Sequence, residues 1–107
     1  MAMAERRSFA RKKRRFLVEF NLQGSSCTGF TYDVSPSGIF VRSSHLPELN
    51  KPLAVTLHLP DDKRVVVRGK VIRSFRVPAT LSRVIPSGFA LQVSDSPEEY
   101  FQFLMTL

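Results

Sequence analysis

From Phe16 onwards, apolar side chains recur at every second position in a series of short runs. A period of two is typical of β-strands that bury one face. The first two runs have their apolar residues at Phe16, Val18, Phe20, Leu22, Phe30, Tyr32 and Val34. Further runs are expected at 38–43, 53–59, 65–75 and 89–93, and the breaks between runs contain Gly24, Pro36, "PDD" at 60–62 and "PSG" at 86–88. The sequence therefore predicts six strands.

Short strands in series with hairpin-like connections favour an antiparallel barrel, because closing the sheet removes its exposed edges. The fifth run is the longest and has Gly69 at its middle, which predicts a bend or a bulge there. The alternation also predicts that a set of aromatic side chains points into the barrel: Phe16, Phe20, Phe30, Tyr32 and Phe89. We therefore expect a mostly β fold, a six-stranded antiparallel barrel.

The period changes at the end of the sequence. Apolar residues recur there at helical spacing, at Tyr100, Phe103, Leu104 and Leu107. Ser96 is the expected N-cap, Pro97 the expected first helical residue, and Glu99 the expected partner of Ser96 in a capping box. We expect a short C-terminal helix whose apolar face covers the open end of the barrel.

The positive charge is concentrated in the first 15 residues. This segment holds seven basic residues against one acidic residue, a net charge of +6 out of a total of +7. A block of like charge with few apolar residues stays solvated until an anion neutralises it. We therefore divide the chain into a flexible basic arm at 1–15, which is expected to contribute to a phosphate-binding site, and a barrel with its helix at 16–107.

The chain offers little for catalysis or metal binding. His45 and His58 have no neighbouring nucleophile, Cys27 is the single cysteine, and there is no Gly-rich phosphate loop. No apolar run approaches the roughly 18 residues of a membrane span, and the basic N-terminus lacks the apolar segment of a secretory signal. We expect a cytoplasmic protein of one domain that is not an enzyme, uses no cofactor and does not insert into a membrane.

Two segments carry a resemblance to a known family. The arm and the first strand read "ERRSFARKKRRFLVEF", and "DVSPSG" follows one strand later. Together they resemble the PilZ domain, a bacterial receptor module for cyclic di-GMP whose signature pairs an RxxxR arm with a [D/N]xSxxG turn on a six-stranded barrel. The "RGKVIR" and "GFALQV" strands and the terminal helix extend the resemblance over the whole chain. The turn is the more specific half of the signature, because RxxxR is common in so basic a run.

The resemblance implies that arginines of the arm bind the ligand. Arg7 and Arg11 fit the family's usual distance to the first strand, and Arg6 is a candidate third contact. Arg11 and Arg15 also spell RxxxR, but that register places the second arginine against the strand. Arginine suits this ligand because its planar fork pairs with phosphate oxygens or with a guanine edge and also stacks on a base.

The turn and the fifth strand supply the other candidate contacts. The signature falls on Asp33, which can accept from guanine N–H groups, on Ser35, which can donate to phosphate or brace the turn, and on Gly38, which can adopt positive φ or let the backbone approach a ligand. A turn that only closes itself is the alternative. The resemblance also implies ligand-facing side chains at Arg73 and Phe75.

A receptor of this kind signals to another protein, and the sequence does not identify that effector or its pathway. The apolar connection at 77–87 is a candidate docking surface. A small nucleic-acid-binding barrel, with the arm on the phosphate backbone, is the main alternative. It is disfavoured here because the aromatic residues fall on the face that the barrel is expected to bury. A basic arm resting on an anionic membrane surface is a further alternative.

Overall fold

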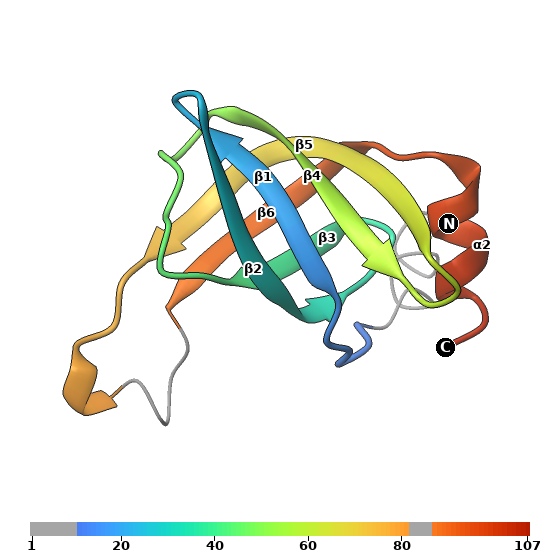
Figure 1. Cartoon of the computed structure of the whole chain (residues 1–107), viewed down its shortest axis with the longest axis horizontal. Helices are drawn as coiled ribbons and strands as arrows, with labels where there is room; N and C mark the ends of the chain where they lie inside the picture. Colours follow the sequence, from blue (N-terminus) through green and yellow to red (C-terminus); the bar gives the residue numbers. More distant parts are fainter. Residues whose placement is uncertain (1–10, 82–86) are drawn as a thin grey trace, which may run out of the picture.

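The computed structural model describes residues 11–81 and 87–107. Its strands are β1 (Leu17–Leu22), β2 (Ser25–Val34), β3 (Gly38–Arg42), β4 (Pro52–Leu59), β5 (Lys63–Phe75) and β6 (Gly88–Asp95), followed by helix α2 (Glu98–Leu104), with a 3-10 turn η1 (Ala79–Leu81). The strands close in the order β1-β2-β3-β6-β5-β4, and every neighbouring pair is antiparallel. Figure 1 shows the barrel with α2 at one end. The predicted six-stranded antiparallel barrel is confirmed.

Strand β5 shows how the alternation builds the core. Val65, Val67 and Val71 are buried inside the barrel, whereas the basic residues between them are exposed. The register with β6 shifts between Arg68 and Gly69, which confirms the predicted bulge. A side chain at Gly69 would collide with the carbonyl oxygen of Gln92, so the close approach of β6 requires glycine at this position.

The face of β2 was predicted wrongly. Phe30 and Tyr32 point outward, with 36% and 38% of their surface exposed. The cause is the tight β1–β2 hairpin, whose register sets Phe20 opposite Cys27. Directly opposed residues share a face of the sheet, so the inward position of Phe20 forces Cys27, and then every second residue up to Thr31, to face inward as well. The other aromatic predictions hold better, because Phe20 and Phe89 are buried in edge-to-face contact and Phe16 is half-buried.

Helix α2 covers one end of the barrel, as predicted. Tyr100 and Leu104 are buried, and the Phe103 ring packs against Phe16 with 5.5 Å between ring centres. The predicted capping box is wrong. The N-cap is Pro97, one residue after the predicted Ser96, and no side chain caps the helix. Pro97 has extended backbone angles, so the helix begins only at Glu98. Ser96 therefore lies outside the position from which a side chain caps the first turn.

Candidate functional site

The β2–β3 turn is closed by its own serine. The Ser35 N–H donates to the Gly38 carbonyl at 2.9 Å, and the Ser35 hydroxyl accepts from the Gly38 N–H at 3.1 Å. Only 2% of Ser35 is exposed. Of the two roles that the sequence left open for Ser35, the structure uses its hydroxyl to brace the turn.

Arg11 and Asp33 meet beside this turn. The guanidinium donates from Nε to Asp33 Oδ1 at 2.9 Å and from Nη2 to the same oxygen. Gly38 lies directly below, and a Cβ atom built on it would lie 3.1 Å from Arg11 Nη1. Gly38 has no positive φ, which among the described glycines occurs at Gly24. The positive-φ explanation of Gly38 is therefore wrong, and this glycine instead leaves room for a guanidinium.

The described part of the arm runs along β2. Lys12 and Val34 exchange backbone hydrogen bonds of 2.8 and 2.9 Å. The Thr31 hydroxyl donates to the Arg14 carbonyl at 2.6 Å and accepts from the Phe16 N–H at 2.8 Å. These bonds tie residues 12–16 to the strand and so fix the position from which Arg11 reaches Asp33.

Alternate arm residues pair with outward side chains of β2. Arg11 contacts Asp33, the Lys13 ammonium lies 5.7 Å from the centre of the Tyr32 ring, and the Arg15 guanidinium lies 3.9 Å from that of Phe30. The arrangement brings Arg11 to the turn and Arg15 to Phe30. It therefore favours the motif register of Arg7 and Arg11. Arg6 and Arg7 themselves lie outside the described residues.

Tyr100 of α2 is a site residue that the sequence reasoning missed. Its hydroxyl donates to the Ser35 carbonyl at 2.7 Å. Burial raises the pKa of the Tyr100 phenol well above its usual value, and the charge of Arg11 partly opposes this shift. Helical spacing identified Tyr100 as a buried residue, but nothing in the sequence pairs it with a turn 65 residues earlier. The C-terminal helix thus holds the candidate ligand-binding turn from inside.

Arg73 and Phe75 lie on the same outer wall as the turn, but on β5. The register pairs Asp33 with Phe40, Phe40 with Ala90, and Ala90 with Arg73, so one cross-strand row joins the two places. Three strand spacings make this row roughly 14 Å long. Arg73 is exposed, and Phe75 is half-buried against Phe40. The structure therefore gathers Arg11, Asp33, Ser35 and Gly38 and leaves Arg73 and Phe75 at the far side of the same wall.

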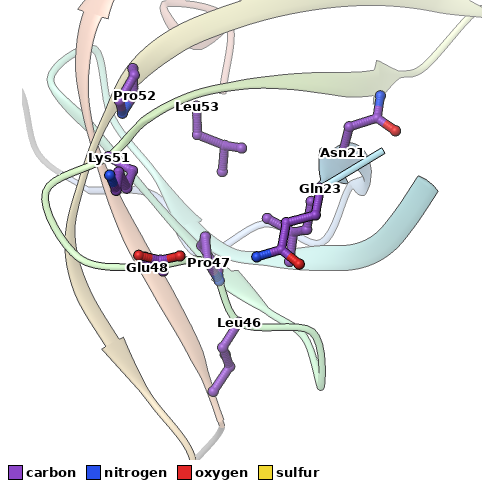
Figure 2. Close-up of a pocket in the computed structure, with 9 residues that line it drawn as sticks. Asn21, Gln23, Leu46, Pro47, Glu48, Lys51, Pro52 and Leu53 are labelled. Carbon is purple, nitrogen blue, oxygen red and sulfur yellow. The ribbon is translucent and has the colours of Figure 1, made fainter. Parts of the chain in front are cut away.

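Two pockets differ in their chemistry. One, of about 230 Å³, lies between the arm, β2 and the end of β3 and is lined by Lys13, Arg14, Arg15, Thr31, Tyr32 and Arg42, with basic but no acidic side chains among these residues. The other, of about 330 Å³, lies at the barrel end away from α2, and apolar residues such as Leu46 and Leu53 share its lining with polar ones such as Asn21 and Gln23 (Figure 2). Lys51 is the basic residue of its lining, and Glu48 lies there too. An anionic ligand is better matched by the first pocket.

Within residues 11–81 and 87–107, no three His, Cys, Asp or Glu side chains gather closely enough to hold a metal ion. In the same part of the chain, no helix is both long and apolar enough to cross a membrane.

The fold and the site define a small closed barrel that presents an arginine–carboxylate pair over a Ser-Gly turn. The sequence matches the PilZ domain family over residues 5–104. The chain therefore belongs to the PilZ family, whose members are cyclic di-GMP-binding receptor and adaptor modules. No curated protein matches the sequence significantly.

Among solved structures, the fold is similar to that of the Bacillus subtilis inhibitor of motility, MotI/DgrA. The TM-score is 0.74 at 17% sequence identity, and the match covers 92% of this chain and 47% of that chain. This chain thus spans about half the length of that protein. At this identity the likeness shows a shared fold.

Proposed function

We propose that this protein is a receptor for cyclic di-GMP, which it binds between the arginines of its arm and the β2–β3 turn. Membership of the PilZ family supports the ligand. The observation that carries the proposal is the placement of Arg11, whose guanidinium contacts Asp33 and lies over Gly38. In this proposal, the space over Gly38 is kept for an arginine that meets the ligand, whereas a turn that only closed itself would not need that space.

Each residue of the site has a chemical role in this proposal. Arg7 and Arg11 pair with phosphate oxygens or stack on guanine, and Arg6 adds a third contact. Asp33 accepts from N–H groups on a guanine edge. Ser35 holds the turn in place rather than reaching the ligand, in line with its burial and its bonds to Gly38. Arg73 and Phe75 contact the far side of the ligand.

Ligand binding is coupled to a change in the arm. In the described structure Asp33 already holds the Arg11 guanidinium, so a ligand that uses either group must replace or share this pair. Residues 12–16 are tied to β2, and the change is therefore expected at residues 5–11. An altered arm surface is read by an effector protein. The chain acts as a receptor without catalysing a reaction.

Calorimetric titration with cyclic di-GMP tests the proposed site. Arg11→Ala removes a charge-assisted contact and is expected to weaken binding by about 1.5–3 kcal/mol, roughly ten- to a hundredfold. Arg68→Ala makes the same chemical change on the outer face of β5, outside the proposed site, and is the matched control. Equal affinities of wild type and Arg11→Ala would move the site elsewhere.

Amide hydrogen exchange tests the change in the arm. The Lys12 N–H and the Phe16 N–H are hydrogen-bonded to β2 and are expected to be protected without ligand. Residues 5–10 are expected to gain protection only when cyclic di-GMP is added. Equal exchange of residues 5–10 with and without saturating ligand would rule out the arm as the moving part.

A nucleic-acid-binding barrel is the second candidate, and one observation favours it more than the sequence did. Phe30 and Tyr32 are exposed on β2 next to basic arm residues, and stacking aromatics beside cations are typical of single-strand binding. Titration of the protein with a short single-stranded DNA at two salt concentrations separates the candidates. Micromolar, salt-dependent DNA binding together with no cyclic di-GMP binding would favour this second function.

A further inference from the structure

The first half of β5 carries exposed side chains of mixed chemistry, which we call the β5 row and define as Arg64, Val66 and Arg68. These residues alternate with the buried Val65 and Val67, so their side chains share the outer face of the sheet. Val66 is 43% exposed, although valine is usually a buried residue. The row therefore presents an aliphatic side chain between two guanidiniums.

Small side chains of β4 flank the β5 row. The register sets Val66 opposite Thr56 and sets Arg68 opposite an exposed alanine, Ala54. Side chains of this length do not cover the longer ones beside them. The row is therefore open to solvent on its β4 side.

A hollow of about 410 Å³ lies on the other side of the row, where β5 passes the start of α2 (Figure 1). All three residues of the β5 row line this hollow. Two carboxylates line it as well, Asp95 at the end of β6 and Glu99 in α2. The register sets Arg68 opposite Asp95. The hollow thus combines an aliphatic side chain with charges of both signs.

The charges around the hollow are available to another molecule. In the part of the chain that the structure describes, ion pairs join Arg11 to Asp33 and His58 to Glu19. The two guanidiniums and the two carboxylates of the hollow take no part in these pairs, and all four side chains belong to exposed residues. A partner with complementary charges can therefore pair with them without breaking a contact of the fold.

We infer that the β5 row and its hollow dock a segment of another protein that carries an acidic, an aliphatic and a basic side chain. The inference goes beyond the proposed receptor function and does not depend on it. Arginine forks pair with a carboxylate of the segment, and its aliphatic side chain covers Val66. Its basic side chain pairs with Asp95 or Glu99. Nucleic acid and anionic membrane surfaces carry negative charge alone and would be repelled by these two carboxylates, so the charge pattern favours a protein.

Backbone amide NMR of the full chain tests this surface with a synthetic peptide that repeats glutamate, leucine and lysine. We expect the largest shifts at residues 64–68 and 95–99. Arg68→Ala is expected to weaken peptide binding about five- to thirtyfold, and Val66→Thr roughly two- to fivefold because it removes apolar contact. Arg42→Ala changes an exposed arginine of β3, outside the hollow, and is the matched control. Its affinity for the peptide is expected to equal that of wild type.

Two further probes separate docking from attraction to the basic arm. Polyglutamate of the same length and vesicles of phosphatidylglycerol and phosphatidylcholine are expected to bind Arg68→Ala as tightly as wild type. Absence of peptide shifts, or an equal loss of peptide affinity in Arg42→Ala and Arg68→Ala, would overturn the docking surface. Tighter binding of polyglutamate or vesicles than of the peptide would overturn the choice of a protein partner.

Titration with cyclic di-GMP keeps this inference apart from the proposed function. Arg68→Ala is expected to bind cyclic di-GMP as wild type does, because Arg68 lies outside the proposed ligand site. Normal cyclic di-GMP binding without peptide binding would overturn the docking surface alone. Peptide binding at residues 64–68 without cyclic di-GMP binding would support the docking surface and overturn the receptor.

Discussion

Gly38→Ala separates a glycine required by the turn from a glycine required by the ligand. Gly38 has no positive φ, so alanine fits its backbone conformation. Its Cβ atom would lie 3.1 Å from Arg11 Nη1 and 3.5 Å from the Leu91 carbonyl oxygen. The second distance is an ordinary contact, whereas the first requires the Arg11 guanidinium to move by a few tenths of an ångström. The side chain of Arg11 is 47% exposed, so there is open space for that movement, although the two hydrogen bonds to Asp33 must adjust with it.

If Gly38 is required by the ligand and not by the turn, Gly38→Ala keeps the stability of the fold and weakens ligand binding. A Gly→Ala change at a compatible position stabilises a fold by about 0.4–1 kcal/mol through the unfolded chain, so the stability of Gly38→Ala is expected to be unchanged or slightly raised. Moving Arg11 away from its position over the turn weakens a charge-assisted contact to the ligand. Because Arg11 is displaced and not removed, we expect affinity for cyclic di-GMP to fall, but by less than the roughly ten- to hundredfold expected for Arg11→Ala.

Gly24→Ala provides the matched control. Gly24 has φ of 84° in the β1–β2 hairpin, and nothing lies within 4 Å of a Cβ atom there. Alanine at this position strains the backbone by about 1–2 kcal/mol but leaves the ligand site untouched. Chemical unfolding is therefore expected to show a loss of stability for Gly24→Ala, and calorimetric titration an unchanged affinity for cyclic di-GMP. This pattern is the reverse of the one expected for Gly38→Ala. A Gly38→Ala protein that loses stability but keeps wild-type affinity would refute the functional reading of this glycine.

Three further predictions concern the groups around the turn. Tyr100→Phe removes the hydrogen bond to the Ser35 carbonyl, which then keeps only a longer contact of 3.4 Å from the Gly38 N–H. We expect the free energy of unfolding to fall by about 1 kcal/mol and the thermal midpoint by roughly 4–8 °C. Tyr32→Phe changes an exposed tyrosine and is expected to stay close to wild type. Because burial raises the pKa of Tyr100, the folded protein holds this proton more tightly than the unfolded chain does. The stability of the wild type is therefore expected to fall as the pH rises above about 10. Denaturant titrations at several pH values should show a smaller fall for Tyr100→Phe. Asp33→Ala is expected to weaken cyclic di-GMP binding while changing the unfolding free energy by less than about 1 kcal/mol, since its ion pair with Arg11 is partly exposed; unfolding of this variant at room temperature would instead indicate a structural role.

The barrel could be predicted from sequence because strand alternation is a local property. Val65, Val67 and Val71 alternate with exposed residues and point inward as the pattern predicts, and Gly69 marked the bulge because a glycine inside a strand is itself a local signal. The face of β2 was missed because its outward residues, Phe30 and Tyr32, are more apolar than the inward Gly29 and Thr31. Hydrophobicity therefore indicated the wrong face, and the hairpin register decided the right one.

The site was predictable in part for a similar reason. The signature residues Asp33, Ser35 and Gly38 are close in sequence and are brought together by one turn. The hydrogen bond from Tyr100 to Ser35 and the contact of Phe40 with Phe75 depend on how α2 and β5 close against distant strands. No local pattern reports such contacts. The same limit explains why the sequence left two explanations of Gly38 open, since only the fold shows that this glycine lies under the Arg11 side chain.

The central claim is that cyclic di-GMP binds at the β2–β3 turn, and backbone amide NMR during a titration with this ligand tests it most directly. The account predicts saturable binding, with the largest shifts at residues 33–40 and 11–12 and smaller ones at Arg73 and Phe75. Two control ligands, a linear dinucleotide and a short single-stranded DNA, are expected to shift these signals less at the same concentration. Shifts confined to the opposite barrel end around Leu53, or no shifts at millimolar ligand, would contradict the claim.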